Sequence, residues 1–113
     1  MADALLGETK ELRRRAVELA FLGKHRRAAR LFEELAERQP RDPQIALKLG
    51  ELRRKLGDLP GARETTARAA LLFAELGLEG KSRAAWSLVA ELDEEVEAAA
   101  VGLPWWRRLF GYA

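Results

Sequence analysis

Few residues in this sequence have the types and spacing that catalysis requires. His25 is the single histidine, it lies in the cationic run Gly23-Lys24-His25-Arg26-Arg27, and the chain has no cysteine. One histidine without a thiol supplies neither the ligands of a zinc site nor a hydrolytic triad. Residues 77–82 include a lysine and a serine but lack the glycine spacing of a phosphate-binding loop. We therefore predict no catalytic site, no metal and no cofactor, and interpret His25 as an exposed turn residue.

An acidic segment late in the chain is the other candidate for chemistry. Asp93, Glu94 and Glu95 are consecutive, and consecutive side chains on a helix point in different directions, so we interpret them as a solvated face. Residues 75–97 hold seven acidic and two basic side chains, whereas residues 10–68 hold nine acidic and sixteen basic ones. This asymmetry either steers an acidic partner to the basic part or lets the acidic helix lie beside basic neighbours.

The tail, residues 101–113, has the composition of a binding segment. On a helix its apolar residues would share one face and its arginines would flank that face: Trp105, Trp106, Leu109, Phe110, Arg107, Arg108. Three destinations remain open for it: the exposed end of the helical domain, a partner protein or second copy of the chain, and a membrane surface. Residues 107–111 resemble the C-terminal membrane-targeting tail of the bacterial Min-system division ATPase.

The elements that must position these residues are paired helices. Small residues recur 34 positions apart: Ala16 and Gly50, Gly23 and Gly57, Ala28 and Ala62. A helical repeat of this period is typical of a stacked solenoid. Apolar spacing, together with glycine and proline punctuation, predicts helices at about residues 9–22, 26–38, 43–56, 59–76 and 81–99. Because glycine inside a helix costs about 1 kcal/mol, we expect another helix to approach Gly50 closely.

The same spacing predicts which side chains form the core. The expected apolar stripes of the second to fifth helices are Ala28, Ala29, Phe32, Leu35 and Ala36; Ile45, Leu49, Leu52 and Leu56; Ala62, Ala69, Ala70, Leu72 and Phe73; Ala84, Ala85, Leu88, Val89, Leu92 and Val96. With 113 residues, 48% apolar and 34% charged, the chain is expected to be one ordered, soluble domain. We predict no signal peptide or membrane span and a cytoplasmic location, or a peripheral one at the inner face of a membrane.

The repeated positions resemble the tetratricopeptide repeat family over about residues 9–99. The second unit carries the small and apolar signature as Leu49-Gly50, Gly57, Ala62 and Ala69, and the first as Ala16, Gly23, Ala28, Phe32 and Pro40. The second unit departs from the motif at Thr66, where an aromatic is expected, and at Ala74, where a proline is expected. The resemblance implies an all-α, right-handed helix-turn-helix solenoid, with a lead-in (1–8), two units (9–42 and 43–77), a cap helix (78–100) and the amphipathic tail (101–113).

The resemblance also implies that the first helix of each unit lines a concave surface that receives an extended peptide. Carried onto this chain, the partner-binding positions are Lys10, Arg13, Arg14, Val17, Phe21, Gln44, Leu47, Lys48, Glu51, Arg54 and Lys55, with Lys81, Ala85 and Leu88 from the last helix. Because this face is mainly basic, we expect an acidic protein or peptide partner. Val17 and Glu51 stand where repeat proteins that clamp chaperone C-termini have asparagines, so a chaperone tail is not expected.

These observations predict a non-enzymatic adaptor that binds a protein or peptide through its basic concave face. The alternative is a peripheral membrane module tethered by the tail. Self-association stays open, because solenoid ends with exposed apolar surface often pair. Nucleic acid is disfavoured as a partner, since glutamates and the acidic last helix accompany the basic clusters at residues 13–15, 26–27 and 53–55.

Overall fold

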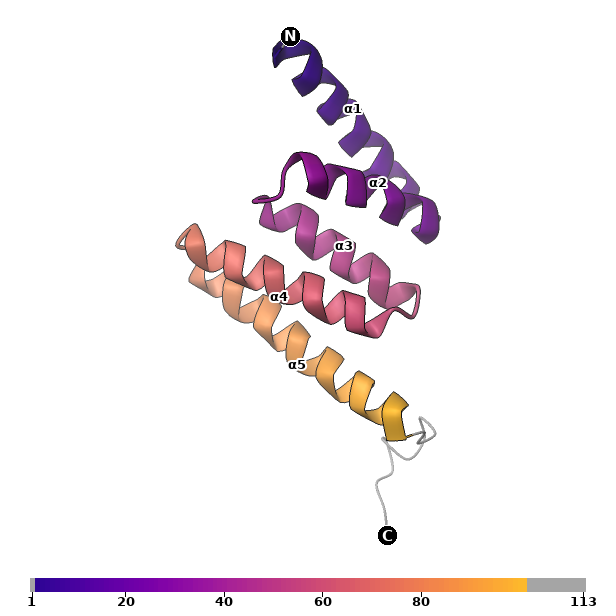
Figure 1. Ribbon diagram of the computed structural model, residues 1–113, viewed down its shortest axis with the longest axis vertical. Helices are drawn as coiled ribbons and strands as arrows, with labels where there is room; N and C mark the ends of the chain where they lie inside the picture. Colours follow the sequence, from indigo (N-terminus) through magenta and orange to yellow (C-terminus); the bar gives the residue numbers. More distant parts are fainter. Residues whose placement is uncertain (1, 102–113) are drawn as a thin grey trace.

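A computed structural model describes residues 2–101, with side-chain environments for residues 7–100, as a stack of helices (Figure 1). The helices are α1 (Ala2–Phe21), α2 (His25–Arg38), α3 (Pro43–Lys55), α4 (Leu59–Glu75) and α5 (Glu79–Val101). No strand occurs in this described part. The prediction of an all-α stack of helices is confirmed. The tail from residue 102 onward, with the tryptophans and arginines singled out above, lies outside the described residues.

The predicted helix boundaries hold closely except at the two ends. α1 begins at Ala2, so the expectation that residues 1–8 precede the first helix was wrong. Its first turns consist largely of alanine, leucine and glutamate, which are good helix formers, and contain no proline that would mark a start. α5 begins at Glu79 and continues to Val101, two residues longer at each end than predicted.

Three helix ends are built in the same way. Gly23, Gly57 and Gly77 have φ values of 76°, 85° and 75° and follow α1, α3 and α4. At the first of these ends the N–H of Gly23 donates to the carbonyl of Ala20 (3.1 Å) and that of Lys24 to the carbonyl of Leu19 (2.9 Å). This is the Schellman pair of hydrogen bonds, which needs a left-handed residue that glycine adopts without steric cost. The predicted roles of Gly23 and Gly57 as helix stops are therefore confirmed.

The start of α3 is fixed by an aspartate cap. The Asp42 carboxylate accepts hydrogen bonds from the N–H groups of Gln44 (2.9 Å) and Ile45 (3.4 Å), and Pro43 occupies the first helical position. Asp42 also accepts from Arg13 of α1, whose guanidinium lies 3.0 Å from it. One carboxylate thus both begins α3 and ties α1 to the α2–α3 loop.

Replacing Asp42 by alanine is expected to cost about 1–2 kcal/mol, because the cap is lost and the Arg13 side chain loses a partner. Asp42→Asn is the matched control, since an asparagine still caps the helix but carries no charge for Arg13. We expect Asp42→Asn to recover most of the loss in urea unfolding. Equal losses in both variants would contradict a capping role and assign the effect to charge.

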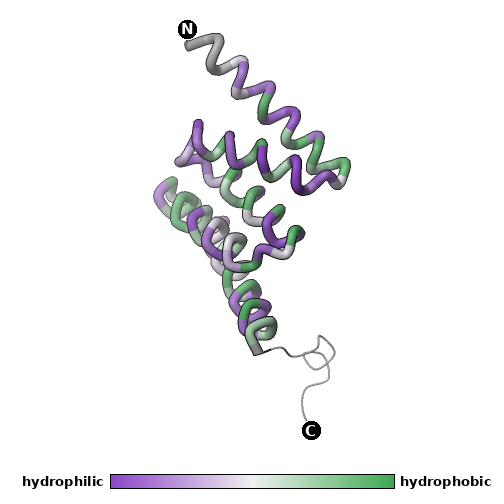
Figure 2. Tube along the Cα trace, turned by 45° about the vertical axis from the view of Figure 1, so that its right-hand side comes forward, coloured by the Kyte–Doolittle hydropathy of each residue, from purple (hydrophilic) through white to green (hydrophobic). Residues whose placement is uncertain are grey.

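The core consists of two clusters that meet at α3. The first joins α1, α2 and the upper face of α3: Ala16, Ala28, Ala29, Phe32, Leu35, Ile45, Leu49, Leu52. The second joins α3, α4 and α5: Ala46, Ala69, Ala70, Leu72, Phe73, Ala85. The helices are amphipathic, so polar and apolar residues alternate along the trace in Figure 2. Because each helix packs mainly on its neighbours in the chain, the stack behaves as a repeat protein.

Most of the predicted core residues are buried, with three clear exceptions. Leu56 is 40% exposed and lies at the C-cap, one residue beyond the end of α3 at Lys55. Ala84 is exposed, and Leu88 is 36% exposed, so neither belongs to the α5 stripe that packs on α4. The buried positions of α5 are the predicted Ala85, Val89 and Leu92 together with Ser82, and they follow one another at spacings of three and four.

Candidate protein-binding site

A hollow of about 220 Å³ lies between α3 and α5 and has α4 as its floor. Its lining is mainly apolar and comes from all three helices: Leu47, Gly50, Glu51, Arg54, Thr66, Leu88, Leu92. We call it the α3–α5 groove. Leu47, Glu51, Arg54 and Leu88 are among the residues predicted to face a partner, and the structure brings them together here. The groove is small enough to receive one apolar side chain with carboxylates or cations around it.

Charged side chains surround the α3–α5 groove and pair with one another. Arg54 forms ion pairs with two glutamates one turn apart on α5, Glu91 at 3.6 Å and Glu95 through a hydrogen bond. On α3 itself, Glu51 pairs with Lys48 (3.3 Å) and Lys55 (3.4 Å). The acidic helix therefore lies beside basic neighbours, which was one of the two interpretations of the charge asymmetry. Each cation predicted for α3 already has a carboxylate partner.

The carboxyl group of Glu51 responds to these neighbours. Partial burial raises the pKa of Glu51, but attraction and hydrogen bonding from Lys48 and Lys55 outweigh it, and the pKa lies below its ordinary value. A carboxylate with a lowered pKa stabilises the folded state above its unfolded pKa, and that contribution is lost as the pH falls through the folded value. Glu51 is thus ionised near neutral pH.

Removing both lysine charges is expected to reverse this shift. In a Lys48→Met, Lys55→Met variant burial alone acts on Glu51, so its pKa should rise above the ordinary glutamate value. An NMR titration of the side-chain carboxyl carbon measures this directly. Lys10→Met, which removes an exposed cation of α1, is the control and should leave the Glu51 titration unchanged. A Glu51 pKa that stays low in the double variant would disprove the assigned cause.

The predicted positions on α1 do not reach the α3–α5 groove. Arg13 turns toward Gln39 (2.7 Å) and Asp42, where it serves the fold. Arg14 pairs with Glu11 (2.6 Å) and Glu18 (3.2 Å) of its own helix. Lys10, Val17 and Phe21 are exposed, and the Phe21 side chain is 89% exposed. The lining of the groove comes from α3, α4 and α5, and no residue of α1 is part of it.

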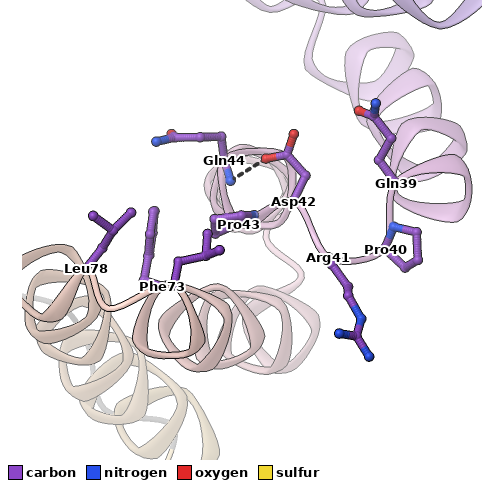
Figure 3. A pocket seen from close by; sticks show the side chains of 9 residues that line it. Gln39, Pro40, Arg41, Asp42, Pro43, Gln44, Phe73 and Leu78 are labelled. Carbon is purple, nitrogen blue, oxygen red and sulfur yellow. Dashed lines mark hydrogen bonds between the residues drawn. The ribbon is translucent and has the colours of Figure 1, made fainter. Parts of the chain in front are cut away.

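A second, wider hollow of about 680 Å³ lies at the loop end of the stack, and we call it the end pocket. Its lining residues are Gln39, Pro40, Arg41, Asp42, Pro43, Gln44, Phe73, Leu76 and Leu78. Figure 3 shows Phe73 and Leu78 on one side and Gln39 and Pro40 on the other, with Asp42 and Pro43 between them. The central carboxylate, Asp42, is engaged in capping α3.

Several predicted residues lie elsewhere than expected. Gln44 lines the end pocket, and the Lys81 ammonium lies 5.9 Å above the ring of Phe73 at the same end. Ala85 was expected both in the apolar stripe of the last helix and on the binding face; it is buried in the core, where the α5 stripe meets α4. His25, expected to be exposed, is half-buried at the first position of α2, and its Nδ1 atom is buried without a hydrogen-bond partner among the described residues.

Sequence reasoning placed Leu88 of α5 on the binding face but missed the contribution of α4 and the ion pairs that α5 makes beside the groove. Thr66 was noted as a departure from the motif, and in the structure it forms part of the groove floor against Gly50. Glu91 and Glu95 were read as solvated, yet both meet Arg54. Their spacing of four residues places them on one face of α5 and was a usable signal. Which basic helix they would face required the packing of the whole stack.

Two features are absent from the described part of the chain, a membrane-spanning helix and a metal-binding cluster. No helix there is long and apolar enough to cross a membrane. No cluster of three or more histidine, aspartate or glutamate side chains suited to a metal ion occurs in the same part of the chain.

The helices form antiparallel pairs, and each pair is stacked on its neighbours in the sequence. A groove lies between α3, the first helix of the second pair, and α5, the helix after that pair. This arrangement defines a helical repeat scaffold. Comparison with family models matches residues 22–92, more than half of the chain, to the tetratricopeptide repeat. The chain belongs to the tetratricopeptide repeat family, whose members generally mediate protein–protein interaction and are typically non-enzymatic scaffolds. Comparison with curated proteins found no match.

Proposed function

We propose that this chain is a non-enzymatic adaptor that binds an acidic segment of a protein partner in the α3–α5 groove. The observation that supports this most is the combination of an apolar hollow, between Leu47 and Leu88, with cations at its edge. A partner's apolar side chain would enter the hollow, and its carboxylates would meet Lys48, Arg54 and Lys55. The hollow gives the partner an anchor, and the charges give it direction.

The existing ion pairs of Lys48 and Lys55 do not prevent such a partner from binding. Lys48, Glu51 and Lys55 have half-exposed side chains, and pairs of this kind typically contribute about 0–1 kcal/mol each. A partner carboxylate can therefore exchange with Glu51 at small cost. The exchange also releases Glu51 toward solvent, where its charge is hydrated. Binding should weaken with added salt, because the new pairs are also exposed.

Affinity capture with paired variants tests this proposal. Immobilised wild-type protein is compared with Lys48→Glu, Lys55→Glu, which reverses the charge at the groove edge. The control is Arg26→Glu, Arg27→Glu, which reverses the same charge on α2, at exposed arginines outside the groove. Proteins retained by the wild type and the control but lost by the groove variant, with unchanged helicity, are groove partners. Identical capture by all three proteins would refute the proposal.

A second candidate function rests on the tail sequence alone. Residues 103–110 combine two tryptophans, two leucines and a phenylalanine with two adjacent arginines, a composition suited to the interface of an anionic membrane. Co-sedimentation with anionic and neutral vesicles tests it, using the full chain, a chain ending at residue 101, and Arg107→Glu, Arg108→Glu. Equal sedimentation of the full and shortened chains would exclude membrane tethering. Since one short segment is a marginal anchor, we expect partial binding even if the proposal holds.

A further inference from the structure

The end pocket is separate from the α3–α5 groove, and the two hollows share no lining residue. Much of its wall is apolar, and two leucines in it face solvent: Leu76 is 61% exposed and Leu78 is 42% exposed. Pro40 lies across the hollow from Leu78, with Pro43 between them (Figure 3). Its volume of about 680 Å³ is within the usual range of ligand pockets, about 300–1,000 Å³, so a large apolar side chain fits inside.

Hydrogen bonds hold the loop on one side of the end pocket in place. Arg13 of α1 donates to Gln39 (2.7 Å) and Asp42 (3.0 Å). From the other side, Arg68 of α4 donates to the carbonyl oxygen of Pro40 (2.9 Å). The loop between α2 and α3 is therefore tied both to α1 and to α4. A binding surface that is already ordered loses less conformational entropy when a ligand arrives.

Two cations beside the end pocket have no carboxylate partner in the described part of the chain. Arg41 lines the pocket and is exposed, and its side chain forms no ion pair or hydrogen bond with the described residues. Lys81 lies near the opposite wall, where its ammonium group is 5.9 Å from the centre of the Phe73 ring. The carboxylate in the lining, Asp42, already pairs with Arg13. The rim of the end pocket is therefore positive.

Separate cations on either side of an apolar hollow suit a particular kind of peptide segment. Side chains alternate along an extended chain, so the residues two positions before and after an inserted side chain point the same way, about 7 Å to either side. Carboxylates at those two positions would meet Arg41 and Lys81. Two cations that stand apart match two carboxylates, whereas a phosphate group needs several donors gathered at one point.

We propose that the end pocket binds an extended segment of a protein partner with the pattern acidic, any residue, apolar, any residue, acidic. The apolar side chain, of about the size of leucine or phenylalanine, packs against Leu76 and Leu78. The two carboxylates pair with Arg41 and Lys81. Because the end pocket and the α3–α5 groove have different linings, the protein can hold two acidic segments at once.

The tail of this chain lacks the chemistry that the end pocket requires. Residues 107 and 108 are arginines, which would add two cations to a rim that is already positive. The tail also begins far from the pocket. Leu78 of the pocket directly precedes α5, and the 23 residues of α5 separate it from the tail by about 34 Å. Charge and position therefore both favour a partner as the occupant.

A titration followed by amide NMR tests the proposal with synthetic peptides. The probe is acetyl-Glu-Ser-Phe-Ser-Glu-amide, and the control peptides replace both glutamates by lysine or the phenylalanine by alanine. With the probe at up to about 5 mM, we expect shift changes at the amides of Gln44, Leu76 and Leu78, and at least about fivefold weaker binding of both control peptides. No change at these amides, changes confined to groove residues such as Leu47 and Leu88, or equal binding of either control peptide would overturn the proposal.

The charge contact is tested by Arg41→Glu, which reverses one cation of the rim. Arg30→Glu is its control, because it makes the same change at an exposed arginine of α2 outside the end pocket. We expect the affinity for the probe, read from the amides of the end pocket, to fall at least about fivefold in Arg41→Glu and to stay unchanged in Arg30→Glu. Equal affinity in these two variants would contradict the assigned contact and overturn the proposal.

The apolar contact is tested by Leu78→Ser. Leu78 directly precedes α5, so a serine there occupies the N-cap position and should preserve the helix. Leu71→Ser, at an exposed leucine of α4 outside the pocket, is the control. Leu78→Ser should weaken probe binding at least about fivefold, and Leu71→Ser should not. The groove variant Lys48→Glu, Lys55→Glu should keep the shifts at the end pocket, so the two sites are tested independently; loss of these shifts in the groove variant would overturn a separate site.

Discussion

Gly50→Val is expected to destabilise the protein by about 3 kcal/mol and Gly50→Ala by about 1–2 kcal/mol. A Cβ atom at this position would overlap the Thr66 hydroxyl oxygen and lie 3.3 Å from the backbone nitrogen of Thr66 and 3.4 Å from the carbonyl oxygen of Ala62. Two of these three atoms belong to the backbone of α4, which cannot move without separating the helices. The roughly 1 kcal/mol that alanine gains in helix propensity offsets part of the overlap.

Thermal unfolding followed by circular dichroism measures this loss, and Gly50→Val should lower the melting temperature by roughly 10 °C or more. Thr66→Ala removes the nearest atom, so the Gly50→Ala, Thr66→Ala pair should lose less stability than the two single losses combined. Gly7→Ala is the control: Gly7 is also helical, but no atom lies within 4 Å of its added Cβ, and it should be neutral or slightly stabilising. A Gly50→Ala variant as stable as the wild type would mean that α3 and α4 are not in close contact here.

Phe73→Ala is expected to cost about 3–5 kcal/mol, the range for removing a buried phenylalanine. Phe73 is among the largest fully buried side chains and belongs to the cluster formed by α3, α4 and α5. Small domains have total stabilities of about 5–15 kcal/mol, so the loss is a large fraction of the whole. In a repeat protein the damage should be greatest in the helices that contact the cavity.

Amide hydrogen exchange distinguishes local from global loss. For Phe73→Ala we expect the largest fall in protection in α4 and α5 and a smaller one in α1 and α2. Phe32→Ala is the matched variant in the other cluster and should show the reverse pattern. Uniform loss of protection along the chain in both variants would show a single cooperative unit and would contradict this prediction.

The fold was predictable to the extent that individual residues mark helix ends. The helix ends at Gly23 and Gly57 were predictable because glycine adopts the left-handed conformation of a C-terminal cap. The start of α3 was predictable because Asp42 followed by Pro43 is typical of a helix N-terminus. Gly50 predicted a close helix contact, and Thr66 of α4 lies beside it. The start of α1 was missed, since residues 2–8 contain helix formers without a start signal.

The candidate site was harder to predict, because it depends on how successive helices lie relative to one another. The family pattern placed residues of α1, α3 and α5 on one concave face, but the α3–α5 groove is lined by α3, α4 and α5, and the exposed Phe21 of α1 does not line it. The ion pairs of the groove were not predicted for a related reason. The sequence shows that Arg54 is basic, but only the packing of α5 on the stack shows that Glu91 and Glu95 lie beside it. The net charge of a helix face does not show which of its charged side chains are already paired with neighbouring helices.

The position of α3 between the two clusters has a consequence for signal transmission. Ile45, Leu49 and Leu52 belong to the first cluster and Ala46 to the second, so the stability of either cluster depends on the same helix being formed. A partner in the groove binds α3 and therefore reduces its local opening. Protection should then rise in α2 as well, although no residue of α2 lines the groove. Binding of a partner in the α3–α5 groove would thus reduce the fluctuations of α2 without changing the fold.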